Sequence, residues 1–255
     1  MGKELDGLRA MLVSPTYGPP PTSCSKSLRV SMMTASNHGI YWTGDASPDK
    51  QGWSSARNMA AQTGVDNSDS TDGIVWVDSD IVLEADSVLK MLVNVLKHRL
   101  DFVTGVYHKK APPYEPVIFG YEDDVDSYLT VEQYPVDPPQ LLAIGACGFG
   151  FVWTSTKLLK AISEMKDFNP DVGMWFPDTR DMPVGWRGPD GRPGMGEDFS
   201  FCDKARRAGY QLYVDTGCLV EHMGDGTAFG RAMYLKWLEE NGGHFKPPDR
   251  KAWRG

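Results

Sequence analysis

Short apolar segments alternate with helix-like segments along the first half of the chain, and this alternation constrains the fold more than any other feature. Apolar runs of strand length occupy residues 8–14, 40–44, 73–77 and 102–107. Helices are predicted between them, over residues 25–36, 54–63 (ended by Gly64) and 86–100. In the third helix, apolar residues at helical spacing are expected to pack on the sheet; they are Val88, Leu92, Val95 and Leu96. Strands that alternate with helices build a largely parallel sheet with helices packed on its faces. The sequence therefore predicts an α/β protein.

The second half of the chain is less regular. Helices are predicted over residues 154–165, 197–208 and 228–240, and a strand over residues 210–215. Residues 112–139 are acidic and interrupted by prolines, whereas residues 141–152 are apolar with small residues that permit close backbone approach. Residues 167–196 are too long for a plain connector, and we interpret them as a mobile lid. The segment contains two aromatic residues, Trp175 and Trp186.

Composition and charge exclude several classes of protein. The chain has 255 residues, of which 41% are hydrophobic, so it can bury an ordinary core and is not a disordered or fibrous protein. Its formal net charge of −8 gives no broad cationic surface for nucleic acid. The longest apolar stretch falls short of the roughly 18 residues that cross a bilayer, so no membrane span is predicted. The amino terminus lacks an apolar signal segment and the four cysteines form no CxxC pair, which predicts a cytoplasmic protein with reduced thiols.

The sharpest local signal is Asp78-Ser79-Asp80, which directly follows the apolar run at residues 73–77. In extended chain, two carboxylates two residues apart point the same way, so both can face one divalent cation. Open α/β sheets bind their ligands at the carboxyl ends of strands, which suits a complex of a metal ion with a nucleotide diphosphate. Taken alone, the tripeptide is explained more simply as a turn that caps the next segment.

Glu197 and Asp198 begin the helix predicted over residues 197–208. Acidic residues at the start of a helix and basic residues at its end stabilise it by about 0.3–1 kcal/mol each, which accounts for both side chains without catalysis. In the alternative interpretation, one carboxylate accepts a proton from an acceptor hydroxyl while the other anchors the neighbouring loop. The residues themselves leave both interpretations open.

Three further residues also have a structural and a functional interpretation. His222 follows a predicted strand, and a neutral imidazole nitrogen is a good ligand for Mn²⁺, although a lone histidine is more often a hydrogen-bonded structural residue. Arg57 and Asn58 lie near the start of a predicted helix. They either contact a nucleotide or form solvated pairs with Asp66 or Asp69.

Taken in order, these signals resemble the motifs of the GT-A-fold glycosyltransferases, above all the family 2 enzymes and their metal-dependent relatives. The resemblance covers roughly residues 8–225 and is one of motif order, without a long identical run. The segments that carry it are Ala56-Arg57-Asn58, residues 75–80 (VWVDSD), residues 145–151, Gly196-Glu197-Asp198-Phe199 and Glu221-His222.

The resemblance implies a GT-A, Rossmann-like fold, which is a mixed, mostly parallel sheet flanked by helices in a single domain. We expect this catalytic domain to cover residues 1–225, with a nucleotide-sugar half at about residues 8–110 and an acceptor half at about residues 111–225. Residues 226–255 are then a C-terminal helix and a basic tail.

The resemblance also implies roles for individual residues. Asp78 and Asp80 match the DxD motif that binds Mn²⁺ or Mg²⁺ on the nucleotide-diphosphate sugar, and His222 is similar to a late histidine ligand of some relatives. Glu197 and Asp198 match the motif that contains the catalytic base. Asp45 is the candidate for an aspartate that often contacts uracil in the family. The residues expected at the nucleotide are Pro15, Thr16, Tyr17, Asp45, Arg57, Asn58 and Asp78.

These roles predict a metal-dependent glycosyltransferase that moves a hexose or pentose from a nucleotide sugar, with UDP the expected nucleotide, to an acceptor hydroxyl. The acceptor is a glycan, a protein or a hydroxymethylated DNA base. Asp198 is the base if the anomeric carbon is inverted, and it positions the acceptor or the sugar if the configuration is retained. Inversion is the favoured outcome. With a sugar substrate, Trp175 and Trp186 either stack on sugar faces or anchor their loop on the core.

Three alternatives remain at this point. A nucleotidyltransferase shares the sheet and the metal site, although the loop Gly18-Pro19-Pro20-Pro21 is a poor phosphate cradle. A sugar- or nucleotide-binding module without turnover would carry the same motifs. In the third alternative, the basic tail with Trp253 is a docking element for DNA or a partner.

Overall fold

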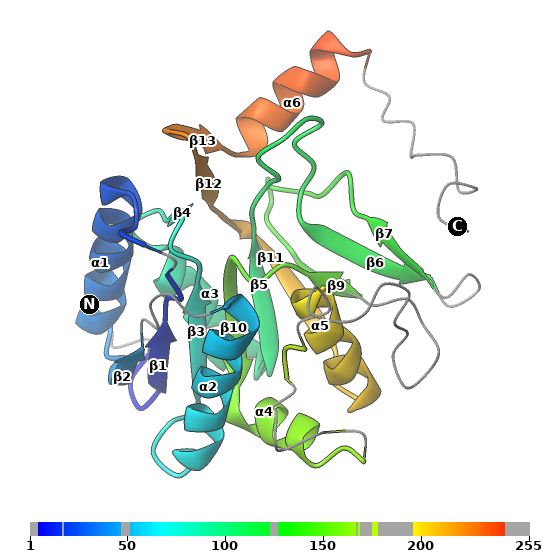
Figure 1. Ribbon diagram of the computed structural model, residues 1–255. Helices are drawn as coiled ribbons and strands as arrows, with labels where there is room; N and C mark the ends of the chain where they lie inside the picture. Colours follow the sequence, from blue (N-terminus) through cyan, green and yellow to red (C-terminus); the bar gives the residue numbers. More distant parts are fainter. Residues whose placement is uncertain are drawn as a thin grey trace.

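A seven-stranded mixed sheet forms the centre of the protein (Figure 1). The computed structural model describes residues 5–16, 18–46, 52–122, 127–166, 168, 175–177 and 196–242, except the side chain of Trp53. The strands, in spatial order, are β2 (Tyr41–Ala46), β1 (Arg9–Val13), β3 (Gly73–Val77), β10 (Phe151–Ser155), β5 (Phe102–Val106), β11 (Leu212–Leu219) and β8 (Leu141–Ile144). Strands β10 and β8 run antiparallel to their neighbours, and the other strands share one direction. The sheet is therefore mostly parallel, as predicted.

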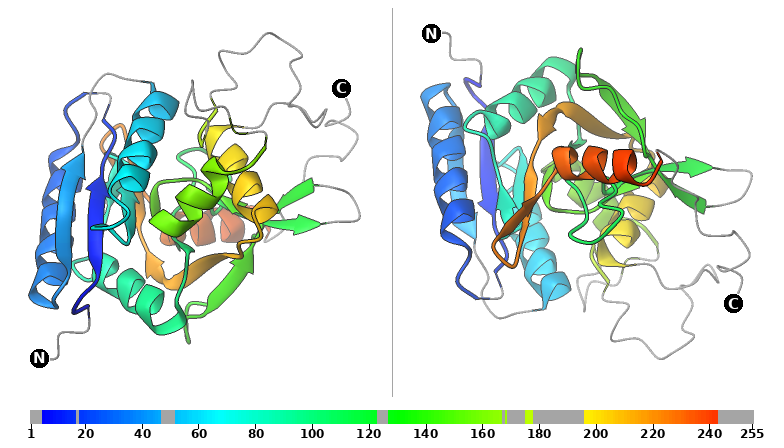
Figure 2. Two further views of the ribbon diagram at one scale, coloured as in Figure 1. Left: turned by 90° about the horizontal axis from the view of Figure 1, so that it is seen from below. Right: turned by 90° about the horizontal axis from the view of Figure 1, so that it is seen from above.

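Helices cover both faces of this sheet (Figure 2). One face carries α1 (Thr22–Asn37) and α3 (Ser87–His98), and the other carries α2 (Trp53–Asp66), α4 (Thr156–Ser163) and α5 (Glu197–Arg207). Side chains of a strand alternate between the two faces, so β3 contributes to two hydrophobic cores. Ile74 and Trp76 pack in the core with Leu158 and Phe201, whereas Val75 and Val77 pack in the other core.

Two small three-stranded sheets extend the fold. One consists of β4 (Ile81–Val82), β12 (Glu221–Gly224) and β13 (Thr227–Phe229), and α6 (Arg231–Glu240) follows it. The other consists of β6 (Ile118–Glu122), β7 (Ser127–Thr130) and β9 (Ala146–Cys147). In Figure 1 the first of these sheets leads from the end of β11 to α6. Within the described residues, none of the helices has the length and apolarity needed to cross a bilayer.

The predicted strands and helices of the first half are present, and three details of the predicted elements along the chain differ from the structure. Gly64 does not end α2, because the helix continues to Asp66 and Gly64 packs against Ile74. The side chain of Leu96, predicted to face the core from α3, is 40% exposed. The last helix begins at Arg231, since the residues before it pair as β13.

The predicted lid at residues 167–196 lies almost entirely outside the described residues, and so does the basic tail. Trp175 is described, and its ring is buried, with the indole Nε1 donating to the carbonyl of Leu159 at 2.9 Å. This ring therefore anchors its loop on the core, and the interpretation as a sugar-stacking surface is wrong for Trp175. The proposed boundaries between the two halves and before the tail stay predictions.

Glycines in the segment before β10 create space for Tyr107, which follows β5. A Cβ atom on Gly148 would overlap the Tyr107 hydroxyl oxygen, and a Cβ on Gly150 would lie 2.8 Å from Tyr107 Cε1. Tyr107 is 7% exposed, so its ring has little room to move away. The close backbone approach predicted for residues 141–152 is therefore confirmed at these two glycines.

We predict that Gly148→Ala lowers the free energy of unfolding by about 1–3 kcal/mol, because the added methyl group overpacks the ring. Tyr107→Phe removes the hydroxyl, leaving Cζ at 3.0 Å as the nearest ring atom, and should recover part of this loss. A double-mutant cycle in chemical denaturation measures the coupling. Gly120→Ala is the control, since its Cβ would have 4.0 Å to its nearest neighbour. Strictly additive effects would contradict the contact.

Candidate functional site

The predicted nucleotide residues lie along the edge of the sheet where β1, β2 and β3 end. These strands are parallel, so their carboxyl ends share one edge. Pro15 and Thr16 follow β1, and the exposed Asp45 lies near the end of β2. Asp78 follows β3 directly. Tyr17 lies outside the described residues. The structure thus places the predicted residues of these three strands on a common edge.

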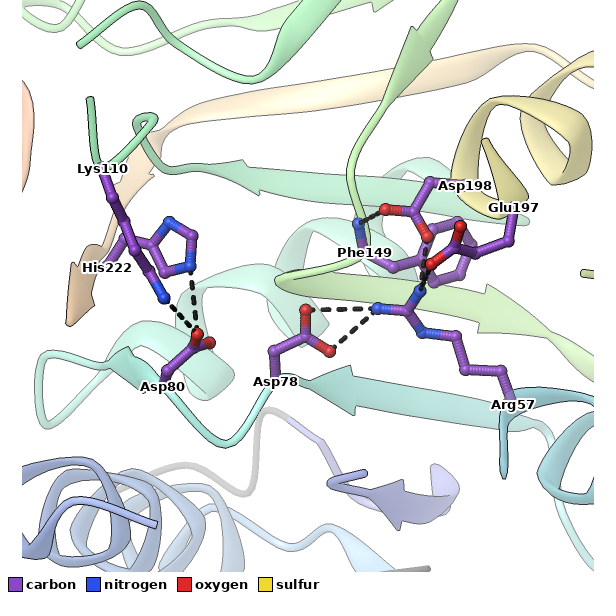
Figure 3. A network of polar contacts seen from close by, with 8 residues as sticks. All are labelled: Arg57, Asp78, Asp80, Lys110, Phe149, Glu197, Asp198 and His222. Atoms are coloured by element: carbon purple, nitrogen blue, oxygen red, sulfur yellow. Dashed lines mark hydrogen bonds and ion pairs between the residues drawn. The ribbon is translucent and has the colours of Figure 1, made fainter. Parts of the chain in front are cut away.

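Arg57 joins three carboxylates from distant parts of the chain (Figure 3). It projects from α2, and its side chain is 4% exposed. One terminal nitrogen donates to Asp198 Oδ1 at 2.5 Å and lies 3.7 Å from Glu197 Oε1, while the other donates to Asp78 at 2.9 and 3.2 Å. A buried guanidinium needs such partners, because its charge is costly without them. The interpretation of Arg57 as a solvated surface residue is therefore wrong.

Asp198 is held from a second side by the backbone of Phe149. Its Oδ2 accepts a hydrogen bond from the Phe149 amide at 3.2 Å. The same segment reaches β3, where the Asp78 amide donates to the Gly150 carbonyl at 3.0 Å. The start of α5, the end of β3 and the segment before β10 are therefore tied together around the guanidinium of Arg57.

A backbone pairing brings Asp80 and His222 together across 142 residues of sequence. Strand β4 begins immediately after Asp80 and pairs with β12, with His222 opposite Ile81. The Met223 amide also donates to the Asp80 carbonyl at 2.7 Å. As a result, His222 Nε2 lies 3.3 Å from Asp80 Oδ2. The structure therefore brings together two of the three residues predicted as metal ligands.

Asp78 and Asp80 do not face the same way as extended chain would require. Residues 79 and 80 form a turn, closed by a hydrogen bond from the Ile81 amide to the Asp78 carbonyl at 3.1 Å. Figure 3 shows the outcome: Asp78 points toward Arg57, whereas Asp80 points toward His222 and Lys110. The prediction that both carboxylates face one cation rested on an extended conformation that the chain does not have here.

The pKa values of two of these carboxylates are raised, and that of the third is lowered. Burial raises the pKa of Asp198 to about 6, with Arg57 opposing the rise and the negative Asp78 and Glu197 adding to it. Burial also raises the pKa of Asp78, again against the effect of Arg57. For Asp80 burial acts upward too, but hydrogen bonds from His222 and Lys110 outweigh it and lower the pKa to about 2.

The Asp80–His222 pair has the chemistry of two metal ligands. His222 Nδ1 lies 3.1 Å from the His108 carbonyl, which can only accept, so Nδ1 donates to it and Nε2 is the ring nitrogen that a metal ion could bind. An octahedral ion with bonds of about 2.1 Å holds neighbouring ligands roughly 3.0 Å apart. The observed 3.3 Å between Nε2 and Oδ2 is close to that spacing. The pair therefore fits a divalent cation.

A complete protein ligand set is not formed. Within the ranges that the structure describes, no three His, Cys, Asp or Glu side chains are grouped closely enough to hold a metal ion. Asp78, the third predicted ligand, is held by Arg57. Mg²⁺-type sites often use only one or two protein carboxylates and take their other ligands from phosphates and water, so this arrangement suits an ion that arrives with a diphosphate.

Three further residues of the site, Asn58, Lys110 and Phe149, make contacts that the sequence analysis did not predict. Asn58 uses its side-chain amide on the backbone of Phe176, with both hydrogen bonds at 2.9 Å. Lys110 contacts Asp80, and Phe149 contacts Asp198, although neither residue was singled out from the sequence. A lone lysine in a loop and a backbone amide carry no sequence pattern that could have identified them.

Comparison with solved structures identifies the fold. The chain is similar to the crystal structure of A197 from STIV, with a TM-score of 0.54 and 15% identity over 88% of this chain and 90% of that one. It is also similar to the crystal structure of GalNAc-T7 with UDP, GalNAc and Mn²⁺, with a TM-score of 0.51 and 10% identity. That match covers 91% of this chain and 48% of GalNAc-T7. No protein-family model and no curated protein sequence matches the chain. The resemblance to GT-A glycosyltransferases is confirmed for the fold, and membership of family 2 stays a prediction.

We predict that Asp198→Asn stabilises the protein at pH 8 by about 1–3 kcal/mol. The raised pKa means that folding favours the protonated carboxyl, so native stability falls as pH rises from about 4 to 6, and asparagine mimics the protonated form. The advantage should vanish below about pH 4, where both states of the wild-type protein are protonated. Chemical denaturation across pH measures it, with Asp66→Asn on the exposed surface of α2 as the control. A destabilised Asp198→Asn protein at pH 8 would contradict the assignment.

Proposed function

We propose that the protein is a metal-dependent glycosyltransferase that moves a sugar from a nucleotide-diphosphate sugar to an acceptor hydroxyl. The observation that carries the proposal is the contact between Asp80 and His222, located at the same edge of a GT-A fold as the Arg57–Asp78–Asp198 network. The GalNAc-T7 structure with UDP and Mn²⁺ supports a UDP-sugar donor and a divalent cation. The acceptor class is proposed to be a glycan, a protein or a hydroxymethylated DNA base.

Asp80 and His222 would hold Mn²⁺ or Mg²⁺ in this proposal. The bound ion would neutralise the charge that grows on the departing diphosphate, where the transition state differs most from the ground state. The protein prepares the ligands in advance, because the β4–β12 pairing fixes both residues and the His108 carbonyl orients the imidazole. Pro15, Thr16 and Asp45 would contact the base and ribose from the ends of β1 and β2, and the same role is proposed for Tyr17 from the sequence alone.

Arg57 is proposed as a positioning residue for both halves of the reaction. It holds Asp78 beside the donor and Asp198 beside the acceptor with a single planar group. Asn58 supports the same arrangement by fixing the backbone of Phe176, whose ring lies next to the guanidinium. We therefore propose that these two residues organise the site, in addition to any contact with the nucleotide.

Asp198 is proposed as the general base of an inverting reaction. Its carboxylate would take the proton as the acceptor oxygen bonds to the anomeric carbon and the bond from that carbon to the phosphate oxygen breaks. A base is most effective when its pKa is close to the working pH, and a pKa of about 6 leaves Asp198 ionised yet basic near neutrality. Glu197 also pairs with Arg57, and its negative charge contributes to the raised pKa of Asp198.

The first test is release of UDP from a panel of UDP-sugars in the presence of Mn²⁺, with water or an acceptor taking the sugar. We expect release by the wild-type protein and its loss in Asp80→Ala, since this variant removes an ion ligand. Asp86→Ala removes an exposed carboxylate nearby in sequence and should keep the activity.

Other outcomes of this experiment select the alternatives. Tight donor binding without release across the panel would indicate a binding module. Pyrophosphate release from a nucleoside triphosphate and a sugar phosphate would indicate a nucleotidyltransferase.

The second test uses pH. The kcat/KM of the donor reaction should fall below about pH 6, because protonated Asp198 cannot accept the acceptor proton. Asp198→Asn should lower kcat by about 10²–10⁴ while donor binding persists, and the limb near pH 6 should disappear. NMR of the product distinguishes the mechanisms, since a retained anomeric configuration would overturn the role of Asp198 as base.

A further inference from the structure

Lys110 occupies the side of Asp80 where a cation would bind. Its Nζ lies 2.6 Å from Asp80 Oδ2, the same oxygen atom that faces His222 Nε2 at 3.3 Å. In Figure 3 the lysine and the histidine approach this carboxylate side by side. Because one oxygen serves both groups, a metal ion bound between Asp80 and His222 would compete directly with the ammonium group.

The position of Lys110 is built into the fold. Its aliphatic chain crosses Gly224 on β12, where a Cβ atom would lie 2.9 Å from Lys110 Cδ. Gly224 lies on the strand that carries His222, two residues further along. The strand therefore provides both the imidazole and the space that guides the lysine toward Asp80. This packing distinguishes Lys110 from an ordinary surface lysine that pairs with any nearby acidic residue.

The contact can be exchanged. The side chains of Lys110 and Asp80 are 37% and 29% exposed, and pairs that solvent reaches contribute only about 0.2–1 kcal/mol. A divalent ion bound by a carboxylate and an imidazole gains more than this. The displaced ammonium would remain at the edge of the sheet where a diphosphate brings negative charge, so it would have a new partner there.

We propose that Lys110 is a resident counter-ion of Asp80 that yields its place to the divalent cation and then pairs with the diphosphate of the donor. This inference rests on the proposed function and adds a residue to it. Lys110 lowers the affinity of the empty site for metal and raises the affinity of the metal-loaded site for nucleotide. Metal and nucleotide therefore bind more cooperatively than they would without Lys110.

The test measures binding by titration calorimetry, first of Mn²⁺ alone and then of UDP with saturating Mn²⁺. Lys110→Gln keeps a hydrogen-bonding side chain but removes the charge. We expect it to bind Mn²⁺ about 3–10-fold more tightly than the wild-type protein and to bind UDP about 3–10-fold more weakly. A variant that had merely lost structure would weaken both.

Lys109→Gln is the matched control. Lys109 is the neighbouring residue and loses the same charge, but it pairs with Glu115 at 2.6 Å. It should leave both affinities within about twofold of wild type, and thermal unfolding of both variants checks that they are folded.

The outcomes separate this inference from the proposed function. If wild-type protein binds Mn²⁺ and UDP while Lys110→Gln behaves like Lys109→Gln, the role of Lys110 is overturned and the metal site stands. If Lys110→Gln weakens Mn²⁺ binding, the competition is overturned. If neither protein binds Mn²⁺, with or without UDP, the metal dependence of the proposed function fails and the inference about Lys110 fails with it.

Discussion

The buried guanidinium of Arg57 is the interaction on which the arrangement of the site depends. A cation that is 4% exposed is tolerated only with close counter-charges, and Asp78, Asp198 and Glu197 supply them from the end of β3 and the start of α5. Removing the cation of such a buried network typically costs about 3–5 kcal/mol, because the carboxylates are left without a counter-charge, whereas loss of one carboxylate leaves Arg57 paired with the other two. The same requirement that stabilises Arg57 therefore fixes where three secondary structure elements meet.

Asp80 and His222 form the other half of the site, and a second, independent interaction positions them. The pairing of β4 with β12 uses backbone hydrogen bonds, and it positions Asp80 and His222 whatever the state of Arg57. The turn at residues 79–80 joins the two halves and directs the two aspartates to different partners. Asp78 belongs to a buried, ion-paired network, whereas Asp80 belongs to a more exposed group, in which we propose that a metal ion takes the place of a lysine. The two aspartates of the Asp78-Ser79-Asp80 motif therefore have different partners and different proposed roles.

The sequence predicted those parts of the fold whose signal is local. The run at residues 73–77 is fully buried as β3, and the spacing of Val88, Leu92 and Val95 placed the buried face of α3 correctly. Strands β4, β6, β7 and β12 were not predicted, because they have at most five residues, although β6 and β7 form a hairpin, as do β12 and β13. Strand β4 is formed by pairing with β12, which is distant in sequence. The same reason explains the site: Asp80 and His222 could be proposed from motif order, but Lys110 and the Phe149 amide enter through tertiary contacts alone. Arg57 resembled a surface residue because its partners lie 21 and 141 positions away.

The charge balance of the site explains why a cation would be needed for this fold to bind a diphosphate. Among the residues drawn in Figure 3, four carboxylates face two cationic side chains, which leaves an excess of two negative charges when His222 is neutral. Such a site repels a diphosphate, since like charges at close range disfavour binding. One divalent ion between Asp80 and His222 would remove the excess, and the ammonium group that it displaces, already counted in this balance, would be able to approach the diphosphate. The electrostatics therefore favour an order in which the ion binds before the nucleotide or together with it.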